Sequence, residues 1–179
     1  SFPDHDSAMT KPPRSPLAPA AFPRLPPLAG VRAAVARSGI RDSAKSDLTF
    51  VELAPGTAVA GVFTTSRTAA APVLWSRRVL GRGRARGLVV NAGNANAFTG
   101  RAGEGATRAT AEAAARELRC PAAEVFIAST GIIGVPLPSQ KILAKLPRLH
   151  RAARPGGWKR IAEAIRTTDT YPKGAGTEV

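Results

Sequence analysis

Two stretches of this 179-residue sequence carry residues that could handle a carbonyl group. In the first, the apolar run 125–128 ends abruptly in Ser129, Thr130 and Gly131. A backbone N–H group freed at the end of a buried strand can stabilise the negative charge that develops on an oxygen during acyl transfer. Thr130 and Gly131 are therefore candidates for an oxyanion hole, to which the Thr130 hydroxyl could add a donor. The alternative is a plain turn between a strand and a loop.

The second stretch is Thr-Thr-Asp-Thr at 167–170, directly after a segment in which Trp158, Ile161 and Ile165 recur at helical spacing. Its hydroxyls and carboxylate suit two roles. They could contact a polar substrate, or they could satisfy the carbonyl groups left unpaired where a helix ends. The sequence leaves both readings open.

Neither stretch contains a residue that could attack a carbonyl carbon with help from a neighbour. The two histidines, His5 and His150, lie in polar or basic contexts without an Asp or Ser partner in the sequence, which argues against a His-based triad. Asp47 and Glu52 are expected at the surface or at a strand edge rather than as an acid–base pair.

The segment 91–100 holds three Asn and two Gly, which is typical of a loop with left-handed backbone conformations. It lacks the Lys and the Gly-x-Gly-x-x-Gly order of loops that bind phosphate. Its Asn side chains are expected to close turns on their own backbone. As an alternative, Asn94 or Asn96 could present an amide to a polar substrate.

The formal charge of +14 and the pI near 11.5 raise nucleic-acid binding as a competing function. The arginines, however, are scattered among Ala and Gly, and aromatic residues make up only 5% and are not interleaved with them. We therefore expect a solvated basic surface, or an acidic partner chain that balances it, and favour both over a nucleic-acid ligand.

The remaining composition points to an ordinary globular domain. The single Cys120 excludes an internal disulfide, and no zinc-ligand spacing accompanies it. The sequence has no apolar run of about 18 residues and no secretory pattern, so we expect no membrane association, a cytoplasmic location and no cofactor.

A change in composition near residue 28 divides the chain in two. Residues 1–27 are rich in proline and are expected to form a flexible leader, whereas residues 28–179 carry the patterns of a folded domain. Strands are predicted at 31–35, 48–53, 58–64, 73–75, 87–91 and 125–128, with 48–53 and 58–64 as a hairpin. Helices are predicted at 104–118, at 139–146 with Ser139 as its cap and Pro147 as its end, and at 158–165. Strands separated by helices indicate an α/β sandwich, with sheets flanked by helices.

Five motifs, in this order along the chain, resemble the bifunctional ornithine acetyltransferase/glutamate N-acetyltransferase family of arginine biosynthesis. They are Ser-Asp-Leu-Thr at 46–49, Ala-Gly-Val-Phe-Thr at 60–64, Val-Asn-Ala-Gly-Asn-Ala-Asn at 90–96, Ser-Thr-Gly at 129–131 and Thr-Thr-Asp-Thr-Tyr-Pro-Lys at 167–173. The resemblance covers residue 28 to the end, and the order of separate motifs makes it specific.

The resemblance implies a precursor that cleaves itself into α and β chains and exposes a Thr at the start of β. That Thr would accept the acetyl group of N-acetylornithine and pass it to glutamate, with its own α-amine as local base and with acetyl-CoA as a possible co-substrate. Thr130 and Gly131 would form the oxyanion hole, and Thr167 would contact substrate. The implied fold is an α/β sandwich built from both chains, usually as an α2β2 tetramer.

This sequence departs from the family pattern after residue 170. The Lys-Gly-x-Gly-Met stretch and the Ala-Thr cleavage point expected there do not occur, because the Lys-Gly-Ala-Gly of 173–176 follows Pro172 too closely. We therefore expect the α-chain portion alone, without its last strand and without the β chain. Such a polypeptide should transfer no acetyl group by itself. A basic nucleic-acid-binding domain, or a related protein with another acyl substrate, remains the alternative.

Overall fold

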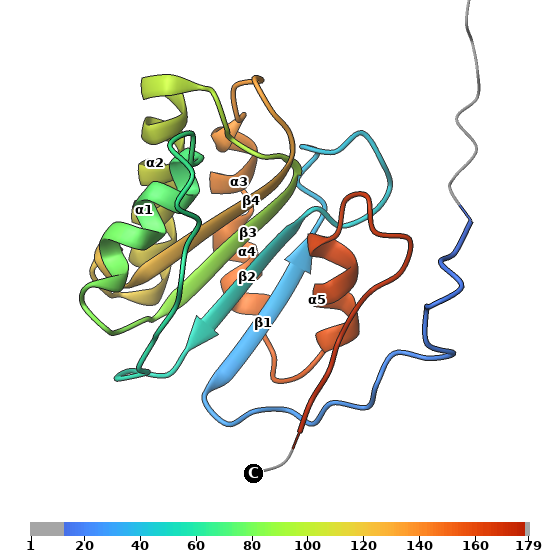
Figure 1. Cartoon of the computed structure of the whole chain (residues 1–179). Helices are drawn as coiled ribbons and strands as arrows, with labels where there is room; N and C mark the ends of the chain where they lie inside the picture. The colour runs from blue at the N-terminus through green and yellow to red at the C-terminus, as the bar shows by residue number, and fades with distance from the viewer. Residues whose placement is uncertain (1–12, 178–179) are drawn as a thin grey trace, which may run out of the picture.

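The computed structural model describes residues 13–177, which form one four-stranded sheet with the strand order β1-β2-β3-β4 (Figure 1). The strands are β1 (Val31–Ala36), β2 (Leu48–Leu53), β3 (Gly87–Asn94) and β4 (Val125–Ile132). β1 pairs antiparallel with β2, and β2 antiparallel with β3. β3 pairs parallel with β4, which requires a crossover that the longest helix supplies.

Helices cover both faces of this sheet. They are α1 (Ala71–Leu80), α2 (Gly100–Leu118), α3 (Ser139–Leu143), α4 (Leu146–Ala152) and α5 (Trp158–Ile165), with a short 3₁₀ helix η1 (Ala122–Glu124). Figure 1 shows α3 and α4 behind the sheet and α5 in front of it, against β1. The α/β fold class predicted from the sequence is confirmed, with a single sheet in the described part of the chain.

The larger core lies between the sheet and α2, α3 and α4. The strands contribute Leu48, Phe50, Val89, Val125 and Ile127, all at most 5% exposed. On the helix side α2 contributes mainly alanines, which let the helix approach the sheet closely, while α3 and α4 contribute larger aliphatic side chains. A second, smaller cluster forms on the opposite face around Val79, Ala85 and Phe126.

The strand predicted at 58–64 is wrong. After the turn at Pro55 and Gly56 this segment makes only a single bridge, between Ala58 and Arg84, and β2 pairs instead with β1 and β3. Val59 packs against the smaller core cluster, but Val62 is 97% exposed, so the segment lacks the continuous apolar face of a core strand.

Two helix boundaries also differ from the prediction. Residues 73–75 lie in α1 rather than in a strand, because Pro72 stands in the first turn of that helix, where its missing N–H costs nothing. Pro147 likewise begins α4 instead of ending the preceding helix, and Ser139 is the first residue of α3 and makes no side-chain cap. The strands predicted near 31, 48, 87 and 125 and the helices near 104 and 158 are confirmed.

The described part of the leader, residues 13–27, contains no helix or strand but contacts the C-terminal part of the chain. The Trp158 indole N–H donates to the carbonyl of Pro26 at 2.8 Å, and the Ser15 N–H donates to the Thr170 hydroxyl at 3.1 Å. Residues 1–12, which include His5, and 178–179 lie outside the described range.

Candidate functional site

Ser129, Thr130 and Gly131 belong to the last part of β4 and not to a turn, because the strand continues to Ile132. Burial changes along this strand: Val125 to Ile127 are buried, Thr130 is half-buried and Gly131 is exposed. The strand therefore runs from the core to the surface, as the sequence indicated, and Thr130 and Gly131 lie where the core ends.

Gly131 packs directly on the backbone of β3. Its φ is +135°, and a Cβ built there would lie 2.3 Å from the carbonyl carbon of Gly93 and 2.6 Å from the amide nitrogen of Asn94. Gly93, at φ +107°, in turn leaves room for the backbone of Arg41, 3.2 Å from its own hypothetical Cβ. Two glycines thus let three backbone segments meet at this corner, and a side chain at either position would separate them.

Helix α1 covers the outer edge of β4 only along the first half of that strand. The Trp75 indole N–H donates to the Val125 carbonyl at 2.9 Å. The Ser76 hydroxyl donates to the Ile127 carbonyl at 2.8 Å and accepts from the Ile127 N–H at 3.0 Å. These side chains satisfy the backbone groups that an edge strand leaves unpaired. Ala128, the next residue, is exposed.

The direction of the remaining β4 backbone groups follows from this pattern. Both backbone groups of Ile127 point to the outer edge, and alternate residues of a strand share a direction, so those of Ser129 and Gly131 do the same. The carbonyl of Ile132 points the other way, since it accepts from the Ala95 N–H at 2.9 Å on the β3 side. The N–H of Gly131 is thus directed away from β3 and the N–H of Thr130 toward it.

Asp47 organises the loop beside this corner. Its carboxylate is fully buried and accepts hydrogen bonds from four main-chain N–H groups, those of Ser38, Gly39, Ile40 and Arg41, at 2.5–3.1 Å. The expectation of a surface or strand-edge role is wrong for Asp47, because these four amides replace the water that the charge loses. The polar loop just before Asp47 is visible in the sequence, but the convergence of these four amides on its carboxylate is not.

The loop that Asp47 holds reaches the second polar stretch. The Arg41 guanidinium donates to the main-chain carbonyl of Arg166, the residue before Thr167. Arg166 itself donates to Glu163 at 2.7 Å and to the carbonyl of Asp169 at 2.6 Å. Asp169 accepts from Lys173, and this hydrogen bond raises the pKa of the exposed Lys173 ammonium.

Thr167 is half-buried just after α5, and neither its hydroxyl nor that of Thr168 makes a hydrogen bond within residues 13–177. Arg41, not a threonine hydroxyl, satisfies the carbonyl at the end of α5. The reading in which these hydroxyls satisfy helix carbonyls therefore finds no support, and the Thr167 hydroxyl keeps its hydrogen-bonding capacity.

Thr130 and Thr167 lie on the same side of the sheet. Thr130 alternates with Phe126 and Ala128 on the face opposite the large core, the face against which α5 packs (Figure 1). None of five cavities found on the described residues is lined by Thr130, Gly131 or Thr167. Gly131 is exposed at this position, and Thr130 and Thr167 are half-buried.

The side chains of Asn94 and Asn96 support the backbone, as the main reading of the Asn-rich segment predicted. Asn94 is 4% exposed, accepts from the Asn96 N–H at 2.7 Å and donates to the Val135 carbonyl at 3.0 Å. Asn96 is 1% exposed and donates to the carbonyl of Gly103 and to the Thr107 hydroxyl, both at 2.9 Å. With their amides committed in this way, neither is free to hold a substrate.

Exposed apolar side chains surround the end of β4. Phe98, Ile132, Ile133 and Val135 are 49–68% exposed. The two segments that carry them are joined by a hydrogen bond from the Gly134 N–H to the Ala97 carbonyl at 2.9 Å. They therefore form one apolar surface next to Gly131, which we call the β4-end patch.

Other reactive groups do not gather at this corner. His150 lies 3.8 Å from a Glu52 oxygen and 3.6 Å from a Glu117 oxygen, in a half-buried cluster on the far face of the sheet that also holds the Arg32–Glu52 ion pair at 3.0 Å. Burial raises the pKa of the Cys120 thiol. Within residues 13–177 no group of three or more His, Cys, Asp or Glu side chains could hold a metal ion. No helix in the same range is long and apolar enough to cross a membrane.

Comparison with known proteins gives a consistent result. The sequence model of the ArgJ family matches residues 32–179. The arginine biosynthesis bifunctional protein ArgJ of Bradyrhizobium diazoefficiens is 51% identical over 159 residues, which make up 89% of this chain and 38% of that protein. The protein of the same name from Gluconobacter oxydans is 49% identical over 173 residues, 96% of this chain and 41% of that protein. The chain therefore spans about two fifths of the length of these relatives.

Solved structures agree with this result. The crystal structure of ornithine acetyltransferase from Mycobacterium tuberculosis, in complex with ornithine, has a TM-score of 0.76 and 45% sequence identity, and the match covers 80% of this chain and 78% of that one. The arginine biosynthesis bifunctional protein of Bacillus halodurans gives a TM-score of 0.72 and 28% identity, with 79% and 74% covered.

Proposed function

Because the chain belongs to the ArgJ family, we propose that it is the α-chain portion of an acetyltransferase that moves an acetyl group from N-acetylornithine to glutamate. In the same proposal, acetyl-CoA serves as a second acetyl donor. The observation that carries the proposal is the corner at Gly131, where a strand leaves the core, loses the cover of α1 and keeps an outward N–H group.

In this proposal Gly131 and Thr130 form the oxyanion hole. Two successive amides of a strand point to opposite sides, so the two donors are the N–H of Gly131 and the hydroxyl of Thr130 rather than two amides. Such donors are typically worth about 3–4 kcal/mol each to the transition state of acyl transfer. The contact between Gly131 and Gly93 supports the role, because a donor fixed in place needs no reorganisation during the reaction.

Thr167 would contact the substrate from the end of α5, on the same face of the sheet as Thr130. Its unpaired hydroxyl supports this role, and so does the Arg41 hydrogen bond that fixes the residue before it. Arg41 donates to the carbonyl of Arg166, next to Thr167, and its backbone packs against Gly93, which contacts Gly131. These contacts fix the position of Thr167 relative to Gly131. The α-amine and α-carboxylate of an amino-acid substrate are groups that a hydroxyl can bind.

The nucleophile would come from a β chain, as the Thr that precursor cleavage exposes. The β4-end patch supports a partner at this position, since contiguous exposed apolar surface marks interaction sites. An α2β2 assembly and a cytoplasmic location complete the proposal. The exposure of Gly131 is consistent with a site that a second chain closes.

A chimaera tests the proposal. Residues 28–179 would replace the matching part of Bradyrhizobium diazoefficiens ArgJ, and conversion of N-acetylornithine and glutamate to ornithine and N-acetylglutamate would be followed by mass spectrometry. We expect an active chimaera and no activity from the 179-residue chain alone. Thr130→Val should lower kcat by about 100-fold with little change in KM, because it removes a donor used in the transition state.

Thr168→Ala is the matched control, since Thr168 is exposed and lies beside Thr167. It should keep kcat within about twofold, whereas Thr167→Ala should raise KM. A Thr130→Val chimaera that folds and retains full kcat would contradict the oxyanion role. Acetyl transfer by the unaccompanied chain would contradict the need for a β chain.

A further inference from the structure

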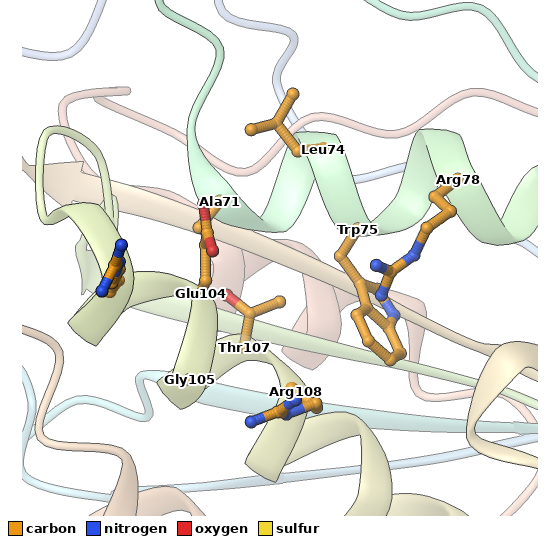
Figure 2. A pocket seen from close by; sticks show the side chains of 9 residues that line it. Ala71, Leu74, Trp75, Arg78, Glu104, Gly105, Thr107 and Arg108 are labelled. Carbon is orange, nitrogen blue, oxygen red and sulfur yellow. The ribbon is translucent and has the colours of Figure 1, made fainter.

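Helices α1 and α2 enclose a groove of about 450 Å³ whose side chains have no role in the proposed reaction (Figure 2). α1 contributes Trp75 and Arg78 to its lining, and α2 contributes Arg101, Glu104 and Arg108. Three guanidinium groups thus line the groove with a single carboxylate. An uncompensated positive lining favours a ligand with more than one negative charge.

Arg78 is held in place before any ligand arrives. Its guanidinium carbon lies over the Trp75 ring, 4.7 Å from the ring centre, and Figure 2 shows the two side chains next to each other. The Trp75 ring is itself fixed by its hydrogen bond to the Val125 carbonyl at 2.9 Å. A guanidinium stacked on an aromatic ring keeps the N–H donors at its rim available for an anion. Pre-ordering also lowers the entropy cost of binding.

Arg101 and Arg108, on the α2 side of the groove, make no strong ion pair within the described residues that would compete with an anionic ligand. Arg101 and Arg108 are seven residues apart, so they lie on one side of α2 two turns from each other. Within residues 13–177, Arg78 and Arg101 take part in no ion pair. Arg108 has a partner in Glu112, but at 4.0 Å and with both side chains more than half exposed the pair is weak.

The wall of the groove also carries a glycine. A Cβ placed on Gly105 would meet no atom within 4 Å, so the space in front of this helical position is open. A neighbouring cavity of about 230 Å³ shares Ala71, Leu74 and Glu104 with the groove and extends it to Phe98. Leu74 and Phe98 are 40% and 68% exposed. The combined space therefore has a cationic end and an apolar end.

We propose that this groove binds an organic phosphate of nucleoside diphosphate size, with its phosphates between Arg78, Arg101 and Arg108 and its uncharged part toward Ala71 and Leu74. Planar guanidinium groups bind phosphate oxygens through paired hydrogen bonds. The inference does not depend on the proposed acetyl transfer. The phosphate groups could be those of a small molecule or of a nucleic acid, and the proposal is for the small molecule.

Isothermal titration calorimetry of the full 179-residue chain with ADP and with inorganic pyrophosphate tests the inference. ADP should bind, and more tightly than pyrophosphate, because only ADP can use the apolar end. Arg78→Gln and Arg101→Gln should each weaken ADP binding by about tenfold. Gly105→Glu, which adds a carboxylate in open space, should weaken it by more than tenfold.

Two controls separate the groove from net charge and from misfolding. Arg82→Gln removes one charge just after α1 but outside the groove and should change affinity by less than about twofold. Gly105→Ala adds only a methyl group and should leave binding intact, and circular dichroism melts check the fold of every variant. The inference is overturned if ADP does not bind, if it binds no more tightly than pyrophosphate, or if Arg82→Gln weakens binding as much as Arg101→Gln. Binding of single-stranded RNA without binding of ADP would also overturn it.

Discussion

Arg41 binds the main-chain carbonyl of Arg166, and through this contact the corner at Gly131 is connected to the polar stretch that begins with Thr167. The main-chain N–H of Arg41 is held at the same time by the Asp47 carboxylate at 3.0 Å. The loop 38–41 therefore acts as a spacer between the two halves of the candidate site, and the buried charge of Asp47 fixes its shape.

The first prediction concerns Asp47→Asn. An asparagine offers a single acceptor oxygen and turns an NH2 group toward main-chain N–H donors, so the four hydrogen bonds to the loop 38–41 cannot all persist. We expect the free energy of unfolding to fall by about 2–4 kcal/mol. Urea denaturation followed by circular dichroism measures this change. Asp42→Asn, which alters an exposed carboxylate directly after that loop, should change the free energy of unfolding by less than about 0.5 kcal/mol.

A second measurement distinguishes local opening of the loop 38–41 from destabilisation of the whole fold. Hydrogen exchange in Asp47→Asn should accelerate at residues 38–41 and at 166–170, because Arg41 links the two segments. Equal acceleration across β3 and α2 would indicate global destabilisation instead. An Asp47→Asn variant as stable as the parent would show that water replaces the carboxylate in the loop.

The sequence predicted the individual elements of this fold better than their contacts. The short apolar runs at β3 and β4 and the spacing of Trp158, Ile161 and Ile165 in α5 each determine local structure, so they could be read directly. The hairpin at 58–64 could not be excluded, because a turn signal at Pro55 and Gly56 says nothing about which strand lies beside β2.

In the candidate site, too, the sequence predicts single residues but not the contacts between them. The sequence predicts Thr130, Gly131 and Thr167 as site residues, but the packing of Gly131 on Gly93 arises only from the parallel pairing of β3 with β4. Asp47 looked like a surface residue because its four donors come from a loop whose shape it creates. A strand at 73–75, as the sequence predicts, leaves no place for the hydrogen bond that Trp75 donates from α1 to the β4 edge.

The second prediction concerns Ser76→Ala. The Ser76 hydroxyl serves both backbone groups of Ile127, and alanine leaves both without a partner at a buried position. An unsatisfied buried backbone group is costly, so we expect a loss of about 1–3 kcal/mol in the free energy of unfolding. Ser66→Ala, which removes an exposed hydroxyl outside the helices and strands, is the control and should change stability by less than about 0.5 kcal/mol.

The same variant should also associate more readily. An uncovered edge strand can pair with a second chain, so sedimentation velocity at increasing concentration should show more dimer for Ser76→Ala than for the parent. Unchanged stability together with unchanged association would mean that α1 does not protect the edge of β4 through Ser76.

The third prediction concerns the reactivity of Cys120. Burial raises the pKa of this thiol above its ordinary value of 9.0, the positive charge of Arg86 opposes the shift, and Glu124 adds to it. The thiolate is the nucleophile, so the rate of alkylation by iodoacetamide should reach half its plateau at a pH above 9.0 in the folded chain and near the ordinary value in urea. Since the folded state holds the proton more tightly, the thiol should favour folding below its unfolded pKa and lose that contribution as the pH rises through the folded pKa.

Glu124→Gln provides the matched test of the cause. Removing this negative charge should lower the alkylation midpoint, because one of the influences that raise the pKa is gone, while the main effect of burial remains. The midpoint should therefore move toward 9.0 without falling below it. A midpoint in the folded parent at or below the value in urea would show that Arg86 outweighs burial, and that Cys120 is a reactive thiol rather than a protected one.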